Sequence, residues 1–206
     1  MQVICFENGI LDSNAYLLYQ DNVGVLIDAG VGTDIVVEKL RELNVSLGYI
    51  ILTHGHVDHI YNANDIRKRT NAKIIAHENE VGLLSDPDGN CSYFVGYTPK
   101  TVVADVLVKD RQTLEVGNVK LEFIHTPGHT IGGMCIKCDN MLFSGDTLFK
   151  NSVGRTDFKT GDLESLKKSI RNKLYTLNDE TVVYTGHGEM TTIGYEKKNN
   201  FFVKDA

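Results

Sequence analysis

Short apolar runs alternate with glycine-containing polar turns along most of this chain, a pattern that predicts β-strands. The predicted strands are Val3–Phe6, Ala15–Tyr19, Val23–Asp28, Tyr49–Leu52, Lys73–Ala76, Val119–Ile124, Met134–Lys137, Met141–Ser144 and Thr181–Tyr184. Apolar residues at helical spacing predict helices over Thr33–Leu43, Ala63–Arg69 and Leu163–Leu174, with Asp162 capping the last. Two successive βα halves without a linker predict one α/β domain over residues 1–206.

The segment from Asp86 to Gln112 shows neither the apolar runs typical of strands nor the apolar spacing typical of helices. It is either a mobile flap over a site, carrying Tyr93, Phe94 and Tyr97, or an ordered connecting loop. The sequence leaves both interpretations open.

Composition narrows the choice of partner. The net charge of -6 argues against nucleic acid, since phosphate binding needs a positive surface. No apolar stretch is long enough to span a bilayer, and the residues from Met1 to Glu7 lack the features of a signal peptide. We therefore expect a cytoplasmic protein that acts on a small molecule; its oligomeric state is left open.

A dense group of metal-binding side chains follows the apolar run Tyr49–Leu52. Imidazole and carboxylate groups suit zinc, iron and manganese, and such a cluster rarely forms by chance. Four such groups are hard to fit around one tetrahedral ion, which favours a site for two metals. They are His54, His56, Asp58 and His59.

Four further segments repeat the design of an apolar strand followed by a glycine-containing turn with a polar residue. The polar residues are Asp28, His129, Asp146 and His187. Because the ends of neighbouring strands meet at one edge of a sheet, we expect these groups to converge there.

These five segments, in this order, resemble the metallo-β-lactamase superfamily of metallohydrolases. The resemblance implies a four-layer αβ/βα sandwich with the metal site at the edge of its two sheets. It implies that one metal is held by His54, His56 and His129, and a second by Asp58, His59 and His187. Asp146 would bridge two divalent ions, expected to be zinc, with iron and manganese as alternatives.

Two more residues acquire supporting roles from the resemblance. Asp28 would orient a ligand or stabilise the site loop, and His125 would support the loop of His129 through hydrogen bonds. His77 is interpreted as a surface turn residue, and Arg155 and Asp157 as an ion pair that fixes the loop after Asp146.

Within the superfamily, the chain is most similar to short glyoxalase II-like proteins. The motifs are Gly145–Phe149, Val153–Asp157, Gly186–Gly188 and Thr191–Glu196. The resemblance implies hydrolysis of a hydroxyacyl thioester such as S-lactoylglutathione by a metal-activated water, with Asp58 and Asp146 as catalytic groups. The chain ends soon after His187, so the C-terminal helical domain that helps full-length glyoxalase II bind glutathione is expected to be absent.

Other activities of the same fold compete with this interpretation. Persulfide dioxygenases carry a motif that resembles Gly154–Phe158. They use one iron, which is held by two His and one Asp. A lactone or other ester hydrolase is a further alternative. β-Lactam hydrolysis is disfavoured because the best-known zinc β-lactamases lack an Asp at the bridging position.

The CxxC pair Cys135 and Cys138 invites a metal or redox role. It has no second CxxC partner, and a spacing of three within a strand would point the thiols to opposite faces. We therefore interpret both as structural cysteines.

Overall fold

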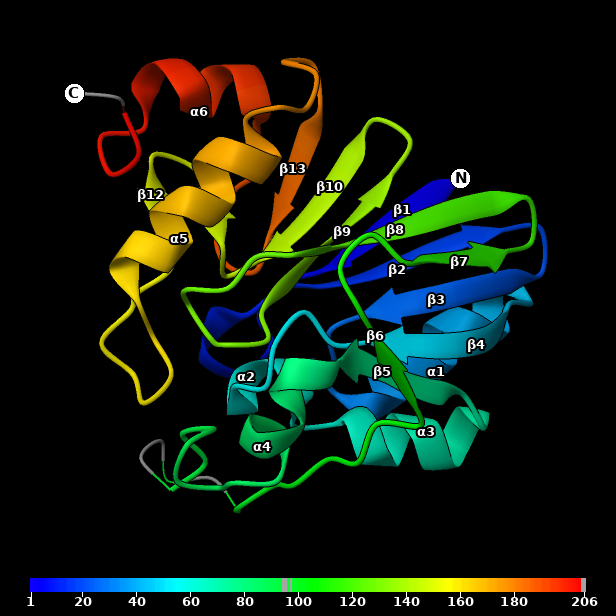
Figure 1. Ribbon diagram of the computed structural model, residues 1–206. Helices are drawn as coiled ribbons and strands as arrows, with labels where there is room; N and C mark the ends of the chain where they lie inside the picture. Colours follow the sequence, from blue (N-terminus) through cyan, green and yellow to red (C-terminus); the bar gives the residue numbers. More distant parts are fainter. Residues whose placement is uncertain (94–95, 97, 205–206) are drawn as a thin grey trace.

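The computed structural model describes residues 1–93, 96 and 98–204. Over these residues, the first of two large sheets has six strands in the order in which they follow along the chain (Figure 1). They are β1 (Gln2–Phe6), β2 (Ala15–Gln20), β3 (Val23–Ile27), β4 (Ser46–Ile51), β5 (Lys73–His77) and β6 (Val106–Val108). Strands β3 to β6 run parallel, so their carboxyl ends lie along one edge.

The second large sheet has the order β14-β13-β10-β9-β8-β7 across the described part of the chain. Its strands are β7 (Thr113–Val116), β8 (Val119–His125), β9 (Met134–Cys138), β10 (Met141–Gly145), β13 (Val182–Thr185) and β14 (Thr191–Thr192). Strands β10 and β13 are parallel neighbours. A small hairpin of β11 (Leu148–Phe149) and β12 (Ser152–Val153) follows β10.

Helices cover the outer face of each sheet, which completes the predicted four layers (Figure 1). Those on the first sheet are α1 (Thr33–Leu43) and α3 (Ala63–Thr70), and those on the second are α5 (Leu163–Ser169), η3 (Ile170–Leu174) and α6 (Ile193–Asn199). The short helices are η1 (Ile10–Asp12), α2 (Val57–Ile60), η2 (Glu78–Glu80) and α4 (Val81–Leu84). Asp162 accepts a hydrogen bond from the Ser165 amide at 2.6 Å, as its predicted capping role requires.

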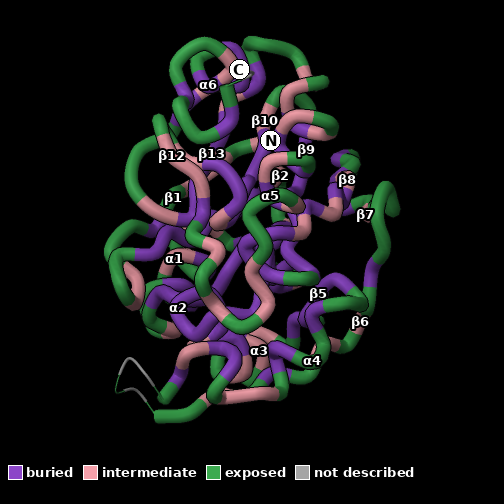
Figure 2. Tube along the Cα trace, turned by 60° about the vertical axis from the view of Figure 1, so that its left-hand side comes forward, coloured by how far each residue is buried: buried purple, intermediate pink, exposed green. Residues whose placement is uncertain are grey.

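Alternation along the strands divides the core between the layers. Leu26 packs toward α1 and α3, whereas its neighbours Val25 and Ile27 pack between the sheets. The β9 cysteines follow the same rule, with Cys135 facing the helices and Cys138 the inter-sheet core. This placement confirms that the two thiols lie on opposite faces of the strand, and both are free and buried. In Figure 2, buried stretches of the chain (purple) run through the middle of the molecule, and exposed stretches (green) lie mostly at its outer loops.

The segment after α4 is an ordered connection where it is described. The Asn90 side chain donates to the Lys100 carbonyl at 2.8 Å, and the Val57 amide donates to the Asn90 carbonyl at 2.9 Å. Tyr93 is exposed, whereas Phe94 and Tyr97 lie outside the described residues. The described part therefore fits a connecting loop, and it ends in a strand, β6, that the sequence pattern did not predict.

No helix in the described part of the chain combines the length and apolar character that crossing a membrane requires.

Candidate metal centre

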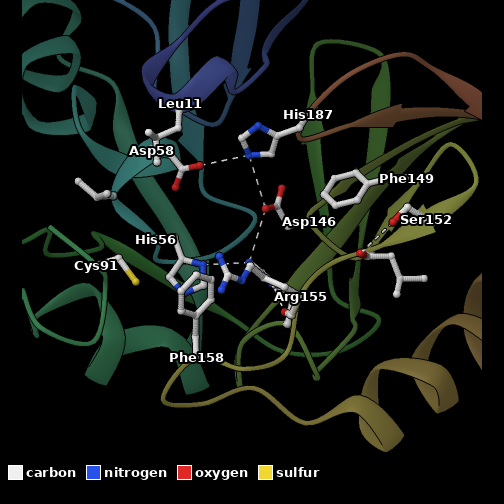
Figure 3. Close-up of a pocket in the computed structure, with 13 residues that line it drawn as sticks. Leu11, His56, Asp58, Cys91, Asp146, Phe149, Ser152, Arg155, Phe158 and His187 are labelled. Carbon is white, nitrogen blue, oxygen red and sulfur yellow. Dashed lines mark hydrogen bonds and ion pairs between the residues drawn. The ribbon is translucent and has the colours of Figure 1, made fainter. Parts of the chain in front are cut away.

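All seven predicted ligands come together where four loops meet at the edge of the two sheets. Figure 3 labels four of them, His56, Asp58, Asp146 and His187. The loop after β4 and helix α2 supply four of them, and the loops after β8, β10 and β13 supply one each. Their side chains form overlapping groups whose donor atoms lie within 4.8 Å of one another. The groups are His54, His56 and His129; His54, His59 and Asp146; and Asp58, His59 and His187.

The first triad, His54, His56 and His129, consists of buried imidazoles. His56 Nδ1 and His129 Nε2 lie 2.9 Å apart and converge on one point. Among the described residues, His54 Nε2 and His56 Nε2 have no hydrogen-bond partner although both are buried. Unsatisfied buried nitrogens are costly, and a cation at the point where His56 Nδ1 and His129 Nε2 converge could also satisfy His54 Nε2.

Hydrogen bonds behind the first triad aim its rings. His54 Nδ1 lies 3.0 Å from Thr53 Oγ1, and His129 Nδ1 lies 2.7 Å from the carbonyl oxygen of Arg155. Burial lowers the pKa of His54 and His129, and it lowers that of His56 to about 3. These rings are therefore neutral near pH 7, the state in which imidazole binds a metal.

The second triad, Asp58, His59 and His187, is richer in charge. His187 Nε2 lies 3.1 Å from Asp58 Oδ2 and 3.3 Å from His59 Nε2. On the far side of the His59 ring, Nδ1 lies 2.8 Å from Asp28 Oδ2. Asp28 also accepts hydrogen bonds from the amide and hydroxyl of Thr53, both at 2.8 Å, so it links the two triads.

The carboxylates change the protonation of this second triad. Burial lowers the pKa of His59, but Asp58, Asp146 and Asp28 together raise it well above its usual value. Burial also lowers the pKa of His187, but the hydrogen bond to Asp58 and the charge of Asp146 raise it overall. Both rings therefore attract protons that a metal would have to displace.

Asp146 lies between the two triads. Its Oδ2 is 3.6 Å from both His129 Nε2 and His187 Nε2, and its Oδ1 is 3.3 Å from His59 Nε2. Glycine is required beside it, because a Cβ on Gly186 would stand 2.1 Å from Asp146 Oδ1. The position fits a carboxylate shared between two cations.

Glu80 is a supporting residue that the sequence pattern did not reveal. Its buried carboxylate accepts hydrogen bonds from the Gly55 amide at 2.8 Å and the Gly132 amide at 2.7 Å. It thereby ties the loop of His54 and His56 to the loop of His129. Burial raises its pKa to about 7. Glu80 lies in a short acidic stretch and belongs to no recognisable motif, so local sequence does not indicate this contact.

The structure corrects the prediction for His77. This residue is only 3 % exposed, because its ring stacks on His125 at 3.9 Å between centroids. His125 in turn lies 3.0 Å, through Nε2, from the carbonyl oxygen of Ile131 in the loop that carries His129. The pair thus joins β5 to β8, a contact between sheets that local sequence could not indicate.

A cavity of about 510 Å³ opens above the ligands. Figure 3 shows Asp58, Asp146 and His187 directed into it, with Leu11, Phe149 and Phe158 on its walls. Arg155 and Asp157 form the predicted ion pair beside it, with contacts of 2.7 and 2.6 Å. The full lining is Leu11, His56, Val57, Asp58, Cys91, His129, Asp146, Phe149, Ser152, Val153, Arg155, Phe158 and His187.

Known proteins share this fold and sequence. The chain is 33% identical over 199 residues to hydroxyacylglutathione hydrolase GloC of Haemophilus influenzae, and the match covers 92% of each protein. Crystal structures superpose closely. The BLEG-1 B3 metallo-beta-lactamase matches with a TM-score of 0.93 and 34% identity, over 99% of this chain and 100% of that one.

Two further structures are similar at lower identity. TTHA1623 in a di-iron-bound form matches with a TM-score of 0.88 and 29% identity, covering 97% of this chain and 99% of that one. ETHE1 from Myxococcus xanthus matches with a TM-score of 0.83 and 29% identity, covering 98% and 84%. The family model of the metallo-beta-lactamase superfamily matches residues 8–187. With its two sheets, covering helices and histidine–aspartate cluster, the chain belongs to the metallo-beta-lactamase superfamily.

Proposed function

We propose that this protein is a dinuclear metal-dependent hydrolase of the glyoxalase II type, which cleaves hydroxyacyl thioesters. The observation that carries the proposal is the pair of complete donor triads joined by Asp146 beneath an open cavity. The similarity to a hydroxyacylglutathione hydrolase and to a di-iron protein supports it.

Each side chain has a defined task in this proposal. Two divalent ions, when bound, would lower the pKa of a water and polarise the substrate carbonyl. One ion would be held by His54, His56 and His129, and the other by Asp58, His59 and His187, with Asp146 shared.

Asp58 and the cavity complete the chemistry. Asp58 lines the cavity and lies 3.1 Å from His187 Nε2, so its carboxylate can orient a water toward the carbonyl carbon and accept its proton. Addition of water across the thioester carbonyl and loss of the thiol yield a carboxylic acid and a free thiol. No serine or cysteine nucleophile is needed.

A persulfide dioxygenase is the second candidate, favoured by the similarity to ETHE1 and by the Gly154–Phe158 motif. Such an enzyme uses one iron, whereas here Asp58, His59 and His187 form a second compact donor group. A mononuclear site would leave this group without a function. The hydrolase is therefore the better interpretation.

The test is parallel assay of one metal-loaded preparation. We expect thiol release from S-D-lactoylglutathione, absent in Asp146→Ala. Oxygen consumption with glutathione persulfide and no thioester cleavage would instead establish the dioxygenase. Because the BLEG-1 structure is described as a B3 metallo-beta-lactamase, nitrocefin is included, and its hydrolysis without thioester cleavage would also overturn the proposal.

A further inference from the structure

We propose that the cavity selects thioesters whose thiol portion is uncharged and largely apolar, in preference to a thiol that carries carboxylates. This inference rests on the proposed thioesterase function and names the substrate class more narrowly. Its basis is the combination of apolar walls with a single lining arginine, Arg155, that already forms an ion pair with Asp157.

The walls outside the metal ligands are mainly hydrophobic. Val57, Phe149, Val153 and Phe158 line the cavity. Leu11 closes one side, and Figure 3 places it beside Asp58. Surfaces of this kind gain free energy by covering apolar groups and lose it when they desolvate charges.

Leu11 is the most distinctive of these wall residues. Its side chain is 51% exposed, and its φ of 53° lies in the left-handed region that leucine rarely adopts. The fold therefore holds a large apolar side chain at the cavity mouth, where it contributes little to the core. An apolar substrate group would bury it.

Among the described residues that line the cavity, Arg155 is the only arginine or lysine. Its guanidinium forms a two-pronged ion pair with Asp157, at 2.7 and 2.6 Å. It also lies 4.3 Å from the centre of the Phe158 ring. A substrate carboxylate would have to displace Asp157 to use this group.

Lysines next to the lining residues in the chain are paired in the same way. Lys150, which follows Phe149, forms an ion pair with Glu189. Lys159, which follows Phe158, lies 2.7 Å from Asp86. Each of these lysines thus has an acidic partner, so the side chains around the mouth add little attraction for a carboxylate beyond that of bound metal ions.

Glutathione presents two carboxylates, and bidentate or charge-assisted contacts usually hold such groups. A thioester of N-acetylcysteamine has the same reacting bond without either charge. With one acyl group on both thiols, we expect kcat/KM to be roughly tenfold higher for S-D-lactoyl-N-acetylcysteamine than for S-D-lactoylglutathione. A higher value for the glutathione thioester would overturn the inference.

A substitution of Asp157 can make Arg155 available to a substrate carboxylate. Asp157→Asn removes the partner of Arg155, and we expect the ratio of the two kcat/KM values to shift toward the glutathione thioester by about threefold or more. Asp34→Asn breaks a similar arginine–aspartate pair, Arg69–Asp34 at 2.9 Å, on α1 and α3. This control should leave the ratio unchanged. An unchanged ratio in Asp157→Asn as well would contradict the role given to Arg155.

Binding of thioethers separates failure of this inference from failure of the proposed activity. S-Hexylglutathione and S-hexyl-N-acetylcysteamine cannot be hydrolysed, and calorimetry on the metal-loaded protein gives their Kd values directly. Tighter binding of the N-acetylcysteamine compound supports the inference even if neither thioester is cleaved. Tighter binding of S-hexylglutathione contradicts it whatever the enzyme hydrolyses.

Discussion

The two donor triads at the sheet edge differ in charge although they share Asp146. His54, His56 and His129 are neutral imidazoles whose pKa values burial lowers. In the second triad, Asp58 and its carboxylate neighbours raise the pKa of His59 and His187. His187 is also partly open to the cavity, with 29% of its side chain exposed.

This difference in charge predicts that the two triads bind a metal ion with different release of protons. A cation can enter the first triad without displacing protons, whereas binding to the second must release them but gains attraction to carboxylates. In the metal-free protein, protons therefore compete with a metal more strongly at the second triad than at the first.

The largest effect is expected from Asp146→Ala, because it removes the carboxylate that both triads share. Metal ions contribute several kcal/mol to such hydrolyses, so turnover should fall roughly a thousandfold or more. Metal content measured by mass spectrometry should fall with it. Asp65→Ala, an exposed carboxylate on α3, should change neither quantity. Activity near that of the unmodified protein in Asp146→Ala would sink the two-metal assignment.

Substitutions within one triad at a time should show how metal binding at the two positions differs. His56→Ala and His187→Ala should each weaken binding at their own position and lower the metal content toward one ion per chain, since each removes one donor of a triad. The ion that remains in His187→Ala should bind with little pH dependence, and that in His56→Ala should bind more tightly as pH rises. The same pH dependence in both variants would show that the triads are equivalent.

A smaller effect is expected behind the second triad. Asp28→Asn keeps the size of the side chain but weakens the contact with His59 Nδ1. Loss of such a supporting carboxylate should reduce metal affinity at the second position by roughly 10- to 100-fold. Titration with a fluorescent zinc chelator measures it. An equal loss at the first position would mean that Asp28 acts mainly through Thr53, to which it is also hydrogen bonded.

The smallest effect concerns the metal-free protein and its stability against pH. The lowered pKa of His56, about 3, means that the unfolded chain takes up a proton below about pH 6.5 that the folded chain refuses. His56 should therefore cost about 1.4 kcal/mol of stability at pH 5.5 relative to pH 7.5. Urea unfolding at both pH values should show this loss reduced in His56→Gln.

The raised pKa of His187 acts in the opposite direction. Its contribution to stability is present below about pH 6.5 and is lost as pH rises through the folded pKa. His187→Gln should therefore make the metal-free protein more sensitive to acid than the unmodified chain. If both variants behave alike, the electrostatic contrast between the triads is wrong.

Local pattern was sufficient for the main elements. The nine predicted strands and three predicted helices all form, because continuous apolar runs and amphipathic periodicity report burial directly. The elements that the pattern missed are short, such as β11, β12, β14 and α2. Pairing across the sheet or the loop geometry stabilises them, and neither leaves a period in the sequence.

In the site, too, local sequence indicated some residues and missed others. Candidate ligands that lie together in the structure could be predicted because imidazoles and carboxylates cluster after strands, where few structural reasons would place them. Glu80 and His77 were not, since their roles depend on Gly132 and His125, which come from the other sheet's loops and strands. Such contacts are set by tertiary packing. The assignment of individual ligands and the cytoplasmic location remain predictions.

The most direct test of the central claim is the number of metal ions per folded chain, measured by native mass spectrometry after loading with zinc or iron and removal of excess metal. We expect two ions per chain, bound in two steps, with protons released mainly in the second step. A single ion at saturation would contradict this expectation, because Asp58, His59 and His187 would then form no metal position.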